Sequence, residues 1–272
     1  MDHAEALTRS LFPGIFTYSV KIKNDTIPDS IFVSFPEQVE LMAAELAGIP
    51  ELAGGFNLMG VSQGGANIRG YIEEFSGKVE GSVVYPKVNA AIGWVSVMAG
   101  VSGVPMLGSG PINDLVTHLL TTIPYDGEIQ KHVAPATYWR DPFELETFVK
   151  KCVYLPVLDN NPDAMSPPDP ARKERFSSLA HLVLLYSEVD KVLIPKETGW
   201  FGTFAPGSYS HVVPVNQTAF WTDDWIGLRA LDESGKVTWG TTMCEHQDYS
   251  SPCFDKYFTQ YVVPVLKQPL AV

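Results

Sequence analysis

The feature that most constrains the fold is an alternation of short apolar runs with amphipathic runs of helical period. Phe56–Val61 reads as a short buried strand, and the apolar residues Ala66, Ile68, Ile72 and Phe75 follow it at helical spacing. Strands that alternate with helices are typical of a parallel sheet that carries helices on both faces. The sequence therefore predicts an α/β fold with a mostly parallel sheet.

The same periodicities predict the other elements. Helices are expected at residues 1–11, 36–47 and 254–266, and strands at 15–22, 90–98, 181–190 and 236–243. From about residue 100 to 175, Gly and Pro interrupt the pattern, and only Ile112–Leu120 and Pro142–Cys152 look helical. We interpret this segment as an insertion over one end of the sheet, within a single domain of residues 1–272.

Charge and hydropathy exclude several functional classes. The chain has 19 Lys and Arg against 31 Asp and Glu, a net charge of −12, so a nucleic-acid partner is not expected. No apolar run reaches the ~18 residues that span a bilayer, and the first ten residues lack the features of a secretion signal. No metal-binding cluster or phosphate-binding loop is apparent, so we expect no metal and no cofactor. These features describe a soluble chain with no targeting segment.

A candidate nucleophile lies between the strand at 56–61 and the helix after it. Residues 60–64, GVSQG, match the G-x-S-x-G pattern, in which a strained strand-to-helix turn exposes a serine hydroxyl above the sheet. The helix that starts after Ser62 supplies backbone N–H groups for a developing oxyanion, and Gln63 would provide the first. The alternative is an incidental loop serine. The strand-to-helix context favours a nucleophile.

A serine nucleophile needs an imidazole base and a carboxylate that orients it. On this fold they follow in the order Ser, acid, His, each beyond the carboxyl end of a strand. Asp190 ends the predicted strand 181–190, with Glu188 as its local competitor. His246 directly follows the strand 236–243, and the other five histidines are less well placed. We therefore predict a triad of Ser62, Asp190 and His246.

The cysteines and the glycosylation sequons constrain the location and the function less than the catalytic pattern does. Cys244 and Cys253 are close enough to close a short loop around His246, or they are ordinary thiols, and Cys152 is left over. Asn24-Asp25-Thr26 and Asn216-Gln217-Thr218 would accept glycans only in a secretory compartment. The two sequons hint at export, whereas three cysteines do not favour a disulfide framework.

The chain resembles the palmitoyl-protein thioesterase family of the α/β-hydrolases along most of its length. The segments that carry the resemblance are FPGIFTYSV, GGFNLMGVSQGGANIRGYI, YWRDP, IPKETGWFG, DDWIGLRALDESGKV and EHQDYSSPCFDKYFTQYVVPVL. The resemblance assigns the family's catalytic roles to Ser62, Asp190 and His246. It also implies an α/β-hydrolase fold with a lid insertion after the sixth strand, a lysosomal or secreted location, glycosylation and a hydrophobic acyl groove under the insertion.

Two departures from the family stand out. Family members begin with a secretion signal and a strand that ends in a His-Gly-Met-Gly-Asp-like oxyanion loop, and this sequence matches neither. We expect an incomplete gene model or a truncated form that lacks one oxyanion donor. After Ala90–Val95 the family tends to carry Gly-Gly and His, whereas this chain has Ser96, Val97 and Met98. The detail of the acyl groove is therefore expected to differ.

The expected activity is hydrolysis of long-chain acyl thioesters, with S-acylated proteins or peptides and acyl-CoA-like thioesters as substrates. Apolar residues of the insertion either line the acyl site or simply pack on the sheet: Val104, Met106, Leu107, Leu115, Leu119 and Phe143. The alternative functions are an oxygen-ester lipase, and an acyl-binding homologue made inactive by the missing first strand.

Overall fold

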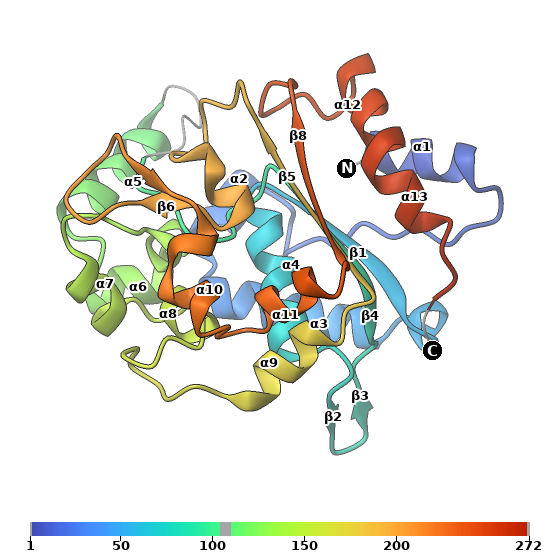
Figure 1. Cartoon of the computed structure of the whole chain (residues 1–272), viewed down its shortest axis with the longest axis horizontal. Helices are drawn as coiled ribbons and strands as arrows, with labels where there is room; N and C mark the ends of the chain where they lie inside the picture. Colours follow the sequence, from blue (N-terminus) through green and yellow to red (C-terminus); the bar gives the residue numbers. More distant parts are fainter. Residues whose placement is uncertain (1, 104–109, 271–272) are drawn as a thin grey trace.

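Four parallel strands form the central sheet of the computed structural model, which describes residues 2–103 and 110–270 (Figure 1). The strand order is β1-β4-β5-β8, with β1 at Phe56–Val61, β4 at Val88–Trp94, β5 at His181–Ser187 and β8 at Val237–Thr242. All seven residues of β4 are buried, because β4 pairs on both sides and helices cover both faces. The mostly parallel α/β sheet predicted from the alternation is confirmed.

The remaining elements are short. Helices α1 to α4 span Asp2–Leu11, Ile27–Phe32, Phe35–Ala47 and Gln63–Glu74, and α5 to α9 span Pro111–Thr122, Gly127–His132, Leu145–Lys151, Leu155–Leu158 and Pro170–Ser177. Helices α10 to α13 span Ala219–Thr222, Leu228–Glu233, Pro252–Tyr257 and Val263–Leu266. The 3-10 turns η1 to η4 span Pro50–Leu52, Ala134–Tyr138, Lys196–Trp200 and Val215–Gln217, and a π-helical turn, η5, spans Phe258–Val262. Two hairpins pair β2 (Val79–Glu80) with β3 (Val83–Val84), and β6 (Thr203–Phe204) with β7 (Val212–Val213).

Two apolar clusters cover the two faces of the sheet. On one face, α3, α4, α9 and α11 contribute side chains such as Leu46, Ile72 and Phe176. On the other face, α1, α12 and α13 pack on β4 and β5 through residues such as Phe254 and Val263 (Figure 1). Burying apolar side chains on both faces is the main driving force for this layered arrangement.

A third apolar cluster joins the insertion to the first part of the chain. It combines Ile31 and Phe35 with insertion residues such as Val116, Ala136 and Leu155. The insertion follows β4, the second of the four paired strands in chain order, rather than a sixth strand. It lies beyond the carboxyl ends of the strands beside α2 (Figure 1). No helix in the described part of the chain has the length and apolar character needed to cross a bilayer.

The strand predicted at 15–22 is wrong. This segment has no ladder partner among the described residues, although Val20 and Ile22 pack against the core and the hydroxyls of Thr17 and Ser19 donate to Glu5. An alternating pattern gives the extended conformation, but a strand also needs a neighbour to accept and donate its main-chain hydrogen bonds.

The other predicted elements differ mainly at their ends. The strand predicted at 90–98 ends at Trp94, because Val95 has a φ of +40° and the chain turns beneath the loop after β1. The helix predicted at 254–266 contains the π turn, which lies before Pro264. Proline cannot donate an N–H and crowds the preceding turn, so the regular ladder is interrupted there.

Within the insertion, the two predicted helices correspond to α5 and α7. Four short elements were not predicted: α6, η2, α8 and α9. Two carried readable signals, since Asp126 and Asp169 cap α6 and α9 and Pro170 follows Asp169 directly. Helix α9 packs on α4 against one face of the sheet. The insertion therefore ends before residue 170, rather than at about residue 175.

Candidate active site

Ser62 occupies a strained turn between β1 and α4. Its φ is 54° and its ψ is −124°, a region that residues with a side chain rarely adopt. A Cβ on Gly60 would lie 2.3 Å from the carbonyl oxygen of Gly64, and a Cβ on Gly65 would lie 2.1 Å from the side chain of Ser96. Glycines are therefore required on both sides of the turn, although the second essential one is Gly65 rather than Gly64, which has open space around it.

Three side chains from separate loops form one hydrogen-bonded chain. His246 Nε2 lies 2.9 Å from Ser62 Oγ, and His246 Nδ1 lies 2.8 Å from Asp190 Oδ2. With the Nδ1 proton donated to the carboxylate, Nε2 is free to accept the serine proton. Asp190 is itself held by the backbone N–H groups of Val192 and Leu193, which donate to Oδ1 at 2.7 and 3.1 Å.

The Asp190 carboxyl is kept ionised by this arrangement. Burial acts to raise its pKa, but the hydrogen bond and charge of His246, together with the two backbone donors, outweigh burial and lower the pKa below the ordinary 3.8. An ionised carboxylate at this position can orient the imidazole and stabilise its protonated form.

The competing acid and the other histidines lie elsewhere. Glu188 pairs with Lys196 at 3.2 Å and accepts a hydrogen bond from Tyr186. His3 contacts Asp255, His132 lies near Glu128, and His181 contacts Thr238. Of the predicted acids and bases, the structure brings together Asp190 and His246 with Ser62.

The loop that carries His246 is tied down at two points. Cys244 and Cys253 form a disulfide, with Cα atoms 5.7 Å apart, and Cys152 is a buried free thiol. The hydroxyl of Ser187, at the end of β5, donates to the carbonyl of Cys244 at 2.6 Å. Of the two alternatives that the spacing left open, the structure has the bridge.

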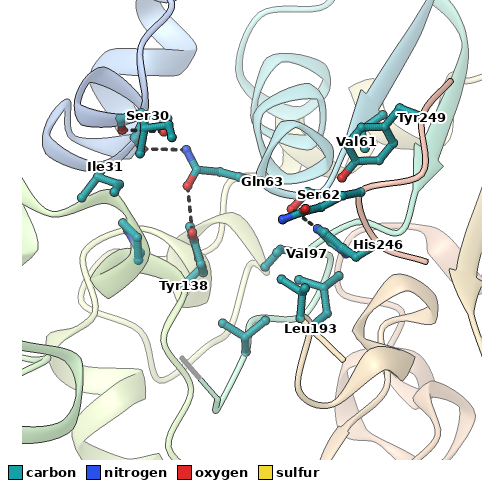
Figure 2. A pocket seen from close by; sticks show the side chains of 15 residues that line it. Ser30, Ile31, Val61, Ser62, Gln63, Val97, Tyr138, Leu193, His246 and Tyr249 are labelled. Carbon is teal, nitrogen blue, oxygen red and sulfur yellow. Dashed lines mark hydrogen bonds between the residues drawn. The ribbon is translucent and has the colours of Figure 1, made fainter. Parts of the chain in front are cut away.

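Gln63 is the first residue of α4, so its backbone N–H has no acceptor within the helix. Its side chain points away from Ser62, toward Ser30 and Tyr138 (Figure 2). The amide Nε2 donates to the carbonyl of Ser30 at 2.9 Å, and Oε1 accepts from the Tyr138 hydroxyl at 2.8 Å. The backbone N–H of Gln63 thus has no acceptor within the helix, whereas its side chain forms hydrogen bonds with Ser30 and Tyr138.

A cavity of about 470 Å³ opens above Ser62, within the ~300–1,000 Å³ usual for ligand sites. Its wall is mainly apolar (Figure 2). The wall residues are Ile27, Ser30, Ile31, Val61, Ser62, Gln63, Val97, Val101, Pro135, Tyr138, Val192, Leu193, His246, Gln247 and Tyr249. A cavity of this kind can hold an apolar chain with its reactive carbon next to the serine.

The predicted lining residues differ from the observed ones. Val104, Met106 and Leu107 lie outside the described residues. Leu115 and Phe143 are exposed and Leu119 packs inside the insertion, so these three do not line the cavity. The wall comes instead from α2, η2, the turn after β1 and the loops after β4, β5 and β8. Of these residues, the sequence predicts only Ser62, Gln63 and His246 at the site. One signal was readable: Thr26 and Asp29 form a capping box that marks the start of α2.

Comparison with known proteins gives a consistent result. Residues 1–246 match the family model described as Palmitoyl protein thioesterase. The chain is 34% identical to Palmitoyl-protein thioesterase 3 of Dictyostelium discoideum, over 98% of this chain and 87% of that protein. It is 27% identical to Palmitoyl-protein thioesterase 1 of Caenorhabditis elegans, over 87% and 77%, and 26% identical to Lysosomal thioesterase PPT2-B of Xenopus laevis, over 68% and 59%.

Proposed function

Because this chain belongs to the palmitoyl protein thioesterase family and is a hydrolase of that type, we propose that it cleaves long-chain fatty acyl thioesters through an acyl-enzyme on Ser62. The observation that carries the proposal is the hydrogen-bonded chain from Ser62 through His246 to Asp190 at the mouth of an apolar cavity. S-acylated proteins or peptides and acyl-CoA-like thioesters are the proposed substrates.

In the first half of the reaction, Ser62 Oγ attacks the thioester carbonyl while His246 Nε2 takes its proton. Asp190 holds the imidazole and stabilises its charge. The oxygen of the tetrahedral intermediate accepts a hydrogen bond from the Gln63 N–H at the start of α4, where the helix dipole also favours negative charge. The carbon–sulfur bond then breaks, and the thiolate leaves as a thiol with the proton from His246.

In the second half, water takes the place of the serine. His246 removes a proton from the water as it attacks the acyl-serine carbonyl, and the same oxyanion contact stabilises the second intermediate. The ester bond to Ser62 breaks, the serine recovers its proton from His246, and the free fatty acid leaves. Thiolate is a better leaving group than an amine, so the step that most needs His246 is activation of the two nucleophiles.

The composition of the cavity supports an apolar acyl group. Ile31, Val97, Val101 and Leu193 lie along its wall, and burying each methylene of an acyl chain against such residues contributes about 0.8 kcal/mol. A long chain gains many such increments and a short chain gains few. The proposed substrate is therefore a long-chain acyl thioester.

A lysosomal or secreted location is part of the proposal. The Cys244–Cys253 disulfide is typical of proteins that fold in an oxidising compartment. Both sequon asparagines, Asn24 and Asn216, are exposed, so each can accept a glycan. Relatives from Xenopus laevis and Drosophila melanogaster carry names that call them lysosomal thioesterases.

The test combines a covalent probe with a substrate pair. We expect a fluorophosphonate to label the wild-type protein on Ser62 and to leave Ser62→Ala unlabelled. We expect wild-type protein to hydrolyse palmitoyl-CoA faster than nitrophenyl palmitate, the oxygen ester with the same chain. Labelling with the reverse preference would indicate an oxygen-ester lipase, and folded wild-type protein that takes no label would rule out a serine hydrolase.

A further inference from the structure

Two walls of the acyl cavity lie outside the sheet and far apart in the sequence. Helix α2 supplies Ile27, Ser30 and Ile31, and η2 supplies Pro135 and Tyr138. They are separated by about a hundred residues, yet α2 packs directly against η2. Their relative position sets the shape of the part of the cavity farthest from the nucleophile (Figure 2).

The part of the cavity next to Ser62 is built differently. Val97 N–H donates to the Ser62 carbonyl at 3.1 Å, and Leu193 N–H donates to Asp190, so these residues are held by the same loops that carry the triad. A short acyl group on Ser62 needs only this region. A long acyl chain must also extend along the wall that α2 and η2 form together.

A set of polar contacts around the buried Gln38 and the half-buried Gln63 connects α2 and η2 to the start of α4. We call Gln38, Gln63 and Tyr138 the amide relay. Gln63 Nε2 donates to the Ser30 carbonyl and to Gln38 Oε1, at 2.9 and 3.1 Å, while Tyr138 donates to Gln63 Oε1 at 2.8 Å. Gln38 Nε2 donates to the carbonyls of Ser30 and Val33 at 3.0 and 2.8 Å.

The relay favours one geometry because almost all of its hydrogen-bond donors and acceptors have partners. Both N–H groups of Gln38 and both of Gln63 can be assigned to acceptors on or beside α2, and Gln38 Oε1 also accepts from Asn67 at 3.3 Å. Gln38 is 1% exposed and does not line the cavity. A shift of α2 would leave the buried amide of Gln38 without a partner, which costs free energy, so the network favours one arrangement.

Aromatic contacts hold the ring of Tyr138 in place. It packs edge-on against Phe35 of α3, with ring centroids 5.8 Å apart, and Phe35 packs against Tyr154 of the insertion at 4.9 Å. The hydroxyl therefore meets Gln63 from a fixed direction, and Tyr138, at the end of η2, is held by the packing of its ring and by the relay at its hydroxyl.

We propose that the amide relay determines acyl-chain preference by fixing the position of α2 relative to η2, which together form the wall that a long chain contacts. Gln38 acts as a positioning residue, because it contacts the wall residues Ser30 and Gln63 but does not itself line the cavity. The inference rests on the proposed thioesterase function and adds which residues select the substrate.

The first test is Gln38→Met, which keeps the length of the side chain and removes its donors and acceptor. Palmitoyl and butyryl thioesters of CoA are compared below the micelle concentration of the former. We expect kcat/KM for the palmitoyl substrate to fall about tenfold, mainly through KM, and the value for the butyryl substrate to stay within about twofold. An equal fall for both substrates, or no change for either, would overturn the inference.

Tyr138→Phe provides an independent variant, with Tyr71→Phe as its matched control. Each change removes the hydroxyl of a buried tyrosine. The Tyr71 hydroxyl donates to the Pro86 carbonyl at 2.7 Å, and neither residue lines the cavity. We expect Tyr138→Phe to lower the palmitoyl-to-butyryl ratio of kcat/KM and Tyr71→Phe to leave it unchanged. The same ratio in both variants would contradict the inference, even if Gln38→Met did not fold. A wild-type protein that hydrolyses butyryl but not palmitoyl thioesters would instead contradict the proposed function.

Discussion

At the scale of single residues, the site depends on one strained position. Ser62 holds φ and ψ values that cost about 1–3 kcal/mol, and the close approaches at Gly60 and Gly65 are what make them reachable. Strain of this size persists only where the surroundings impose it. The backbone conformation of Ser62 thus positions its hydroxyl independently of the contact with His246.

Asp190→Asn is expected to lower kcat by about 10⁴-fold with little change in KM. The Asn oxygen can still accept from Val192 and Leu193, but its N–H₂ group would face His246 Nδ1 and favour the wrong tautomer. Steady-state kinetics beside thermal unfolding checks this. A loss of kcat smaller than tenfold in a folded variant would contradict the assigned role.

The same carboxyl has a defined pH dependence. Its pKa is lower in the folded protein than the ordinary 3.8, so its contacts add stability above that pH and lose it as the pH falls through the folded value. Asp190 therefore stays ionised under mildly acidic conditions, as the proposed lysosomal location requires.

At the scale of elements, a buried charged group links α4 to the insertion. Arg69 Nε lies 2.7 Å from Glu73, and Arg69 Nη2 lies 2.7 Å from Asp159 at the end of α8. The guanidinium also lies 5.2 Å from the centroid of the Phe201 ring. One cation faces two carboxyl groups, so the group would carry an excess negative charge in a buried place if both carboxyls were ionised.

Burial raises the pKa of Glu73 to about 8, and the nearby Arg69 offsets this only in part. Its second oxygen has no hydrogen-bond partner among the described residues, which favours the protonated form. Because the folded pKa is above the ordinary 4.5, this group's contribution to stability is complete below pH 4.5 and is lost as the pH rises through about 8.

Glu73→Gln should therefore leave the free energy of unfolding nearly unchanged at pH 5 and raise it by roughly 1–2 kcal/mol at pH 8.5. Denaturant unfolding at the two pH values measures this. The control is Glu74→Gln, which breaks a pair with Arg172 at 2.6 Å and should gain nothing at high pH. If Glu73→Gln lowers the free energy of unfolding equally at both pH values, then Glu73 is ionised at both and the prediction is wrong.

At the scale of the whole molecule, the described residues of the insertion share their apolar cluster with other parts of the chain. Its cluster includes Ile31, Phe35 and Val39 from the first forty residues and Leu193 from the loop after β5. Separating the insertion from the sheet would expose all of these side chains. The catalytic loops and the insertion are therefore expected to fold as one unit.

We predict that the chain unfolds as a single domain. In hydrogen exchange across a denaturant series, peptides from α6 and α8 should lose protection at the same denaturant concentration as peptides from β4 and β5. The calorimetric and van't Hoff enthalpies should agree. Protection lost first in the insertion would instead indicate two units.

Much of the catalytic arrangement could be predicted from the sequence because its signals are local. The glycines around Ser62 identify the turn, and Asp190 and His246 follow strands that are visible as apolar runs. The helices and strands of the central layers are also confirmed. Residues 15–22 show the limit of such signals, since their alternation predicts a strand and no segment of the described chain pairs with it.

The sequence by itself determined the layered fold and the candidate triad, because short-range periodicity and strand ends specify both. Only the tertiary structure decided the walls of the cavity, the joining of Cys244 to Cys253 and the relay through Gln63. These depend on contacts between segments such as 27–31 and 134–138, which have no shared local pattern. Their position follows from how the apolar clusters pack, and packing is a property of the whole chain.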